Sequence, residues 1–112
     1  MHQYGYFYIM TNAYNTVLCC GATTDLYKRV LEHKNGIFQN SFTLKYNIEK
    51  LVYFECFSIA GDAFEREKQV KAGSRKKKMD LIVNMNPDWK DLFELLKQNQ
   101  GEELIRIKTA LR

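Results

Sequence analysis

The chain has 112 residues, enough for one domain with a single hydrophobic core and too few for two. It carries 17 lysines and arginines against 13 aspartates and glutamates, and the resulting net charge of +4 makes a polyanion a reasonable partner, although an ordinary solvated surface is also compatible with it. No apolar run approaches the roughly 20 residues of a membrane-spanning helix, and the N-terminus lacks the apolar region of a signal peptide.

The three cysteines, Cys19, Cys20 and Cys56, are odd in number, and two of them are neighbours that cannot easily bridge each other. They predict free thiols in a reducing compartment, so we expect a cytoplasmic protein. Their spacing is not that of zinc ligands.

Aromatic and β-branched residues dominate the segment 4–11 and predict a strand, with Tyr4, Tyr6 and Tyr8 on one face. Turn-forming residues at 12–15 separate it from a second strand at 16–22. Because the connection is so short, we expect the two strands to form an antiparallel hairpin.

A helix should follow the second strand, because Thr24 or Asp25 can cap it and apolar residues recur at helical spacing. The apolar stripe consists of Leu26, Val30 and Leu31. We expect the helix to end near Asn35 and Gly36, where glycine suits a left-handed stop.

The middle of the chain is less regular. Residues 37–49 show no periodicity and are expected to form a loop. Residues 51–57 predict a third strand, and because they are largely apolar we expect this strand to lie at the centre of the sheet.

Helices account for much of the remaining chain. Asp62 is expected to cap a helix at 63–72 that ends at Gly73, and Ser74 is expected to begin a second helix that reaches residue 84.

A turn at Asn86, Pro87 and Asp88 leads into a further predicted helix at 89–97. The fold class is therefore α+β, with a small three-stranded antiparallel sheet flanked by helices over residues 1–97. The tail at 98–112 is compatible with one more short helix at 102–111.

Phosphodiester hydrolysis needs charge stabilisation on the phosphate and a proton acceptor for water, and the chain contains candidates for both roles. By themselves, Arg29 and His33 fit a solvated helix face equally well. Arg29 and His33 are four residues apart and share one helical face. Arg29 can hold a phosphate oxygen through its fork of donors, and His33 can receive or relay a proton near neutral pH. Tyr8 is either a core aromatic or a group that orients or deprotonates the attacking water.

Glu67 is the candidate metal ligand, because one carboxylate can anchor a single Mg²⁺ (or Mn²⁺) that keeps several waters. Lys71, one helical turn later, offers Glu67 an ion pair instead. Glu65 lies about 200° away around the helix and should face elsewhere.

Basic residues concentrate between residues 66 and 78. The unbroken run consists of Arg75, Lys76, Lys77 and Lys78. Together with Lys71 this run is a candidate nucleic-acid-binding surface, and a solvated helix face is the alternative.

These motifs, in this order, resemble the GIY-YIG endonuclease superfamily, and in particular its small stand-alone bacterial members, which are similar to the N-terminal nuclease domain of the excinuclease C subunit. The resemblance covers residues 4 to about 93. The residues that carry it are Tyr8 to Asn12, Cys19-Cys20-Gly21 in the place of Tyr-Ile-Gly, Arg29 (since 29 − 19 = 10, at the family's distance), Arg66 to Lys71, and Asn86 to Trp89.

The resemblance implies catalytic roles for Tyr8 as base or water-positioning group, Arg29 as transition-state stabiliser and His33 as phosphate or proton-transfer partner. It also implies that Glu67 holds one divalent ion and that Asn86 supports the site by hydrogen bonds. The implied reaction is hydrolysis of DNA that leaves a 5′ phosphate and a 3′ hydroxyl, with RNA as an open alternative.

Cys19 stands where the family carries its second motif tyrosine, and a thiol is shorter and hydrogen-bonds more weakly than a phenol. If the missing phenol is the principal proton acceptor, activity falls by about 10²- to 10⁴-fold; if Tyr8 or His33 has that role, the loss is smaller. The leading hypothesis is a metal-dependent DNA endonuclease. The alternatives are a non-catalytic nucleic-acid-binding module of the same fold and a protein-interaction domain.

Overall fold

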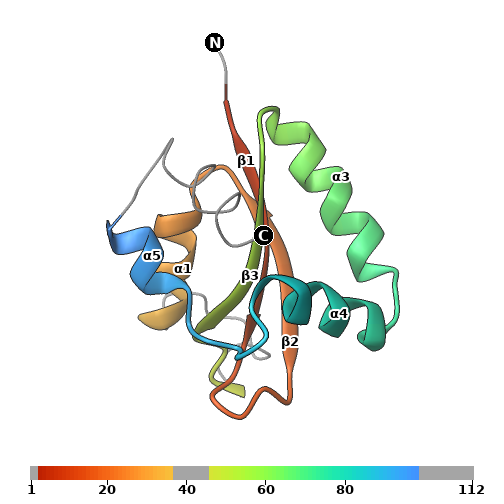
Figure 1. Ribbon diagram of the computed structural model, residues 1–112. Helices are drawn as coiled ribbons and strands as arrows, with labels where there is room; N and C mark the ends of the chain where they lie inside the picture. Colours follow the sequence, from red (N-terminus) through yellow and green to blue (C-terminus); the bar gives the residue numbers. More distant parts are fainter. Residues whose placement is uncertain (1–2, 37–45, 99–112) are drawn as a thin grey trace.

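The computed structural model describes residues 3–36 and 46–98 (Figure 1). The expected loop at 37–49 therefore lies largely outside the described residues, as does the tail beyond residue 98. The elements in chain order are β1 (Gly5–Thr11), β2 (Leu18–Thr23), α1 (Leu26–Lys34), β3 (Lys50–Phe57), α3 (Ala60–Lys71), α4 (Arg75–Met85) and α5 (Phe93–Gln98).

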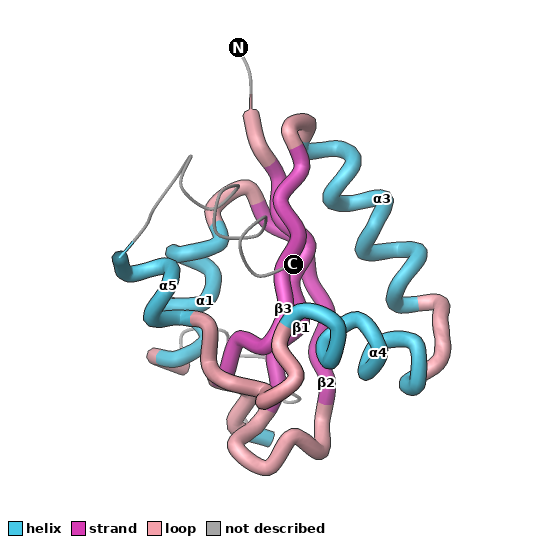
Figure 2. The backbone as a smooth tube through the Cα atoms, in the orientation of Figure 1, coloured by secondary structure: helices cyan, strands magenta, loops and turns pink. Residues whose placement is uncertain are grey.

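The three strands form one antiparallel sheet in the order β2-β1-β3, so the α+β fold and the β1–β2 hairpin are confirmed. Helices α1 and α5 lie on one side of this sheet, and α3 and α4 lie on the other (Figures 1 and 2). The expectation that residues 51–57 form the central strand was wrong, because β1 is central. Residues 51–54 are apolar at a sheet edge because both faces of β3 are buried there.

The core fills both faces of the sheet, because successive side chains of β1 point to opposite sides. Phe7 and Ile9 point toward the α3 and α4 layer, whereas Tyr8 points toward α1. From α1, Leu26 and Val30 complete the core under the second face.

Two of the predicted helix caps are present. Asp25 rather than Thr24 caps α1, since its carboxylate accepts the backbone N–H of Lys28 at 3.1 Å. The hydroxyl of Ser74 caps α4 and accepts the N–H of Lys77 at 3.2 Å. Both starts depend on local side chains, which explains why they could be predicted from the sequence.

Helix α3 begins at Ala60, and the prediction that Asp62 caps it was wrong. Its N-cap is Ile59, which makes no side-chain capping bond, and Asp62 lies within the first turn. The start is set by close packing on β1: a Cβ at Gly5 would lie only 2.7 Å from the Cα of Ala60. Contact with the sheet, rather than a cap, therefore positions this helix.

Helix α5 begins at Phe93 and not at residue 89. The Asn86 side chain accepts the N–H of Lys90 at 3.0 Å and donates to its carbonyl at 2.8 Å, and Trp89 adopts a left-handed backbone with φ of 53°. These bonds hold 86–90 as a turn. Asp91 then accepts the N–H of Phe93 at 3.1 Å and starts the helix there.

Asn86 also compensates for an irregularity of the sheet. The register between β1 and β3 shifts between Ile9 and Met10, so Val52 has no partner there. The carbonyl of Val52 instead accepts Nδ2 of Asn86 at 3.1 Å. None of the helices within 3–36 and 46–98 is long and apolar enough to cross a membrane.

We predict that Asn86→Ala lowers the free energy of unfolding by about 2–3 kcal/mol, because it removes three hydrogen bonds and leaves buried backbone groups without partners. Chemical denaturation measures the effect. Asn84→Ala, at an exposed position in the last turn of α4, is the matched control and should change stability by less than about 0.5 kcal/mol. Equal effects of the two substitutions would contradict the bridging role of Asn86.

Candidate active site

The phenol of Tyr8 reaches across the neighbouring strand. Tyr8 lies opposite Gly21 in the β1–β2 register, and a Cβ at Gly21 would lie 2.3 Å from the Tyr8 hydroxyl oxygen. Only a glycine leaves room for the ring at this place. The side chain is 3% exposed, so its hydroxyl is held below the surface beside β2.

Helix α1 brings Arg29 and His33 to Tyr8, whereas their spacing predicted only that the two share one helical face. The His33 ring meets the Tyr8 ring edge-on with centroids 6.1 Å apart. Arg29 is partly exposed, pairs with Glu32 at 3.7 Å, and acts on the Tyr8 hydroxyl through its charge and a hydrogen bond. The three side chains therefore form one group on the α1 face of the sheet.

Burial decides the protonation states of this group. Burial raises the pKa of Tyr8 to about 12, although the charge and hydrogen bond of Arg29 act in the opposite direction. Burial and then the charge of Arg29 lower the pKa of His33 below 6.5. At neutral pH, Tyr8 is thus a phenol that can donate a hydrogen bond, and His33 is a neutral imidazole that can accept a proton.

Glu67 and Lys71 of α3 lie along the edge of β2. Their charges act on both Cys19 and Cys20, which point to opposite faces of that strand. The Lys71 ammonium nitrogen is 2.8 Å from Oε2 of Glu67. Burial raises the pKa of Cys19, with Lys71 lowering it and Glu67 raising it further, so Cys19 is a protonated thiol at neutral pH.

Glu67 fits a metal site built on one protein carboxylate. Its side chain is 22% exposed, and its charge also acts on Tyr8. Within residues 3–36 and 46–98, no three His, Cys, Asp or Glu side chains cluster as a metal cage. A hard divalent cation that keeps several waters and takes further ligands from phosphate requires no such cage. Glu65 is 72% exposed, pairs with Lys68 at 3.6 Å, and points elsewhere.

Asn86 is placed apart from this group. Its side chain is bonded to Val52 of β3 and to Lys90, whereas Cys19 belongs to β2 on the other side of β1. The basic run is also divided, since Lys76 pairs with Asp80 at 3.2 Å.

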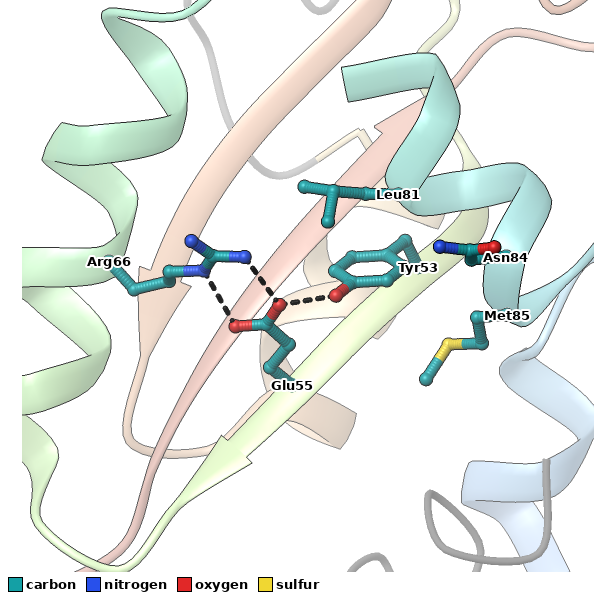
Figure 3. A pocket seen from close by; sticks show the side chains of 6 residues that line it. All are labelled: Tyr53, Glu55, Arg66, Leu81, Asn84 and Met85. Carbon is teal, nitrogen blue, oxygen red and sulfur yellow. Dashed lines mark hydrogen bonds and ion pairs between the residues drawn. The ribbon is translucent and has the colours of Figure 1, made fainter. Parts of the chain in front are cut away.

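A second polar cluster, which sequence reasoning missed, lies on the opposite face of the sheet. Arg66 donates two hydrogen bonds to Glu55, from Nε at 2.9 Å and from Nη2 at 3.0 Å, and the Tyr53 hydroxyl donates to the same carboxylate (Figure 3). A cavity of about 340 Å³ adjoins the cluster and is also lined by Leu81, Asn84 and Met85. The one signal in the sequence was a carboxylate within an otherwise apolar strand.

Comparison with known proteins gives consistent matches. The family model described as the GIY-YIG catalytic domain matches residues 4–80. A UPF0213 protein of Haloquadratum walsbyi is 37% identical over 81 residues, which covers 72% of this chain and 89% of that protein. A UPF0213 protein of Bacillus pumilus is 36% identical over 78 residues, with 70% and 76% covered. The solution NMR structure of a UPF0213 protein from Bacillus halodurans superposes with a TM-score of 0.51 at 26% identity, covering 82% of this chain and 96% of that one.

We predict that Gly21→Ala lowers the free energy of unfolding by about 1–3 kcal/mol, because the new methyl group forces the buried Tyr8 ring to move. Gly61→Ala is the matched control: nothing lies within 4 Å of a Cβ there, and alanine favours helix α3 by about 0.5–1 kcal/mol. Chemical denaturation of both variants measures the contrast. A Gly21→Ala protein as stable as the native chain would show that the ring placement is not constrained.

Proposed function

The chain belongs to the GIY-YIG catalytic-domain family, a family of nucleases, and from that premise we propose that it is a metal-dependent endonuclease that hydrolyses phosphodiester bonds in DNA. The observation that supports this proposal most is that Arg29 and Glu67 both lie near the Tyr8 phenol, which is placed over Gly21 of β2. The three side chains come from three elements, and the charges of Arg29 and Glu67 both act on the Tyr8 hydroxyl.

In this proposal Glu67 holds one Mg²⁺ or Mn²⁺ ion, which when bound neutralises charge on the phosphate as a Lewis acid. Arg29 donates hydrogen bonds to a nonbridging phosphate oxygen through its fixed fork. His33 accepts the proton of the attacking water, since its neutral form is the one present near pH 7. The water oxygen bonds to phosphorus as the bond from phosphorus to the 3′ oxygen breaks, and the departing 3′ oxygen takes a proton from solvent. Tyr8, protonated in the same range, orients that water by donating or accepting a hydrogen bond.

The alternative is a module of the same fold that binds nucleic acid without cleaving it. Cys19 favours this alternative, because burial keeps it a protonated thiol, which is shorter than a phenol and forms weaker hydrogen bonds. Both functions require binding of nucleic acid, and they differ only in turnover.

We predict that Glu67→Gln abolishes Mg²⁺-dependent cleavage of supercoiled plasmid, because the amide keeps the shape of the side chain and removes the charge that holds the cation. Glu65→Gln, two residues away and exposed, is the matched control and should cleave as the native chain does. Cleavage that survives Glu67→Gln would refute the assignment of Glu67 as the metal ligand.

We further predict that Cys19→Tyr raises the cleavage rate by up to about 10²-fold, because it restores the phenol beside Glu67. Cys20→Ala, on the opposite strand face, should leave the rate unchanged. Single-turnover assays on supercoiled, single-stranded and branched DNA measure both. Activity in Cys19→Tyr alone would identify the native chain as the non-catalytic module, and an unchanged rate would show that the missing phenol is not limiting.

A further inference from the structure

Helix α4 does not present its basic run as one surface. Arg75 donates to the backbone carbonyl of Thr16 at 3.0 Å, in the hairpin that leads into β2. Lys78, three residues later on the same helical face, donates to the carbonyl of Gly73 at 3.1 Å. Burial raises the pKa of Cys20 to about 11, and the charge of Lys78 is the strongest influence in the opposite direction. Arg75 and Lys78 therefore both lie beside β2.

The other two lysines of the run point away from this strand. Lys76 is 85% exposed and pairs with Asp80 at 3.2 Å. Lys77 lines a separate cavity of about 390 Å³ between α3 and α4, together with Arg66 and Asn84. Neighbours in sequence are thus on different faces of α4, as the rotation of about 100° per residue requires.

The cations beside β2 follow the strand toward the candidate active site. Arg75 is at Thr16, Lys78 and Lys71 are near Cys20, and the Tyr8 phenol lies over Gly21. From residue 16 to residue 21 an extended chain spans about 17 Å. An edge of this length is long enough to meet several successive phosphates of one DNA strand.

We propose that the phosphate backbone of a DNA strand lies along the edge of β2 and is held there by Arg75, Lys78 and Lys71. Lys76 and Lys77, although they belong to the same run, lie outside this contact. The inference rests on the proposed function, since it takes the phosphate backbone to Glu67. It adds to that function the surface, along β2, on which the DNA backbone lies as it reaches Glu67.

The test compares two adjacent lysines, Lys78→Gln and Lys77→Gln, in a fluorescence anisotropy titration of a labelled 20-base-pair duplex in EDTA between 50 and 200 mM NaCl. Lys78→Gln should reduce the slope of log K against log salt by about 0.9, the value for one lost phosphate contact. Lys77→Gln should keep the native slope, and Lys78→Arg should restore it. Lys68→Gln controls for the loss of one positive charge, because the native Lys68 side chain is 76% exposed on α3.

Equal slope changes in Lys77→Gln and Lys78→Gln, or none in Lys78→Gln, would overturn the inference. Plasmid cleavage with Mg²⁺, measured on the same proteins, separates it from the proposed function. If the native chain cleaves DNA and Lys78→Gln keeps the native slope, the nuclease proposal stands and the proposed DNA contact along β2 is wrong. If the predicted slopes appear without cleavage, the DNA contact along β2 stands and the nuclease proposal is wrong.

Discussion

The arrangement of the candidate site depends on the buried carboxylate of Glu55. A buried carboxylate costs several kcal/mol unless it is fully paired, and here the fork of Arg66 and the hydroxyl of Tyr53 supply three donors (Figure 3). This pairing fixes the rotation of α3 about its own axis. The next residue is turned by about 100°, so Glu67 faces the edge of β2, and Lys71 follows one turn later on the same face.

Burial then narrows the chemistry that the site can perform. It raises the pKa of both Tyr8 and Cys19 and lowers that of His33, so all three are uncharged at neutral pH. A phenol and a thiol that keep their protons cannot act as bases, whereas a neutral imidazole has a nitrogen that can accept a proton. These protonation states support the proposal that His33, rather than Tyr8 or Cys19, accepts the proton of the attacking water. Arg29 remains charged beside it and can stabilise phosphate.

Much of the fold could be predicted because caps, turns and periodicity act within a few residues. The β1–β2 hairpin, α1 with its cap Asp25, and α4 with its cap Ser74 are of this kind. Strand order could not be predicted, since apolar composition reports burial and not the number of neighbouring strands. The start of α5 was missed because the left-handed backbone of Trp89 depends on hydrogen bonds that Asn86 accepts from Trp89 and Lys90.

Sequence spacing alone placed Arg29 and His33 on one face, but it could not divide the basic run, because only the tertiary position of β2 distinguishes Lys78 from Lys77. That position has a physical consequence of its own. Among the described strands, β2 pairs only with β1, and an open strand edge tends to recruit another chain unless charged side chains guard it. Cations beside β2 therefore protect the edge from pairing with protein and leave it attractive to phosphate. The same lysines can satisfy the demands of solubility and of DNA binding, so neither role argues against the other.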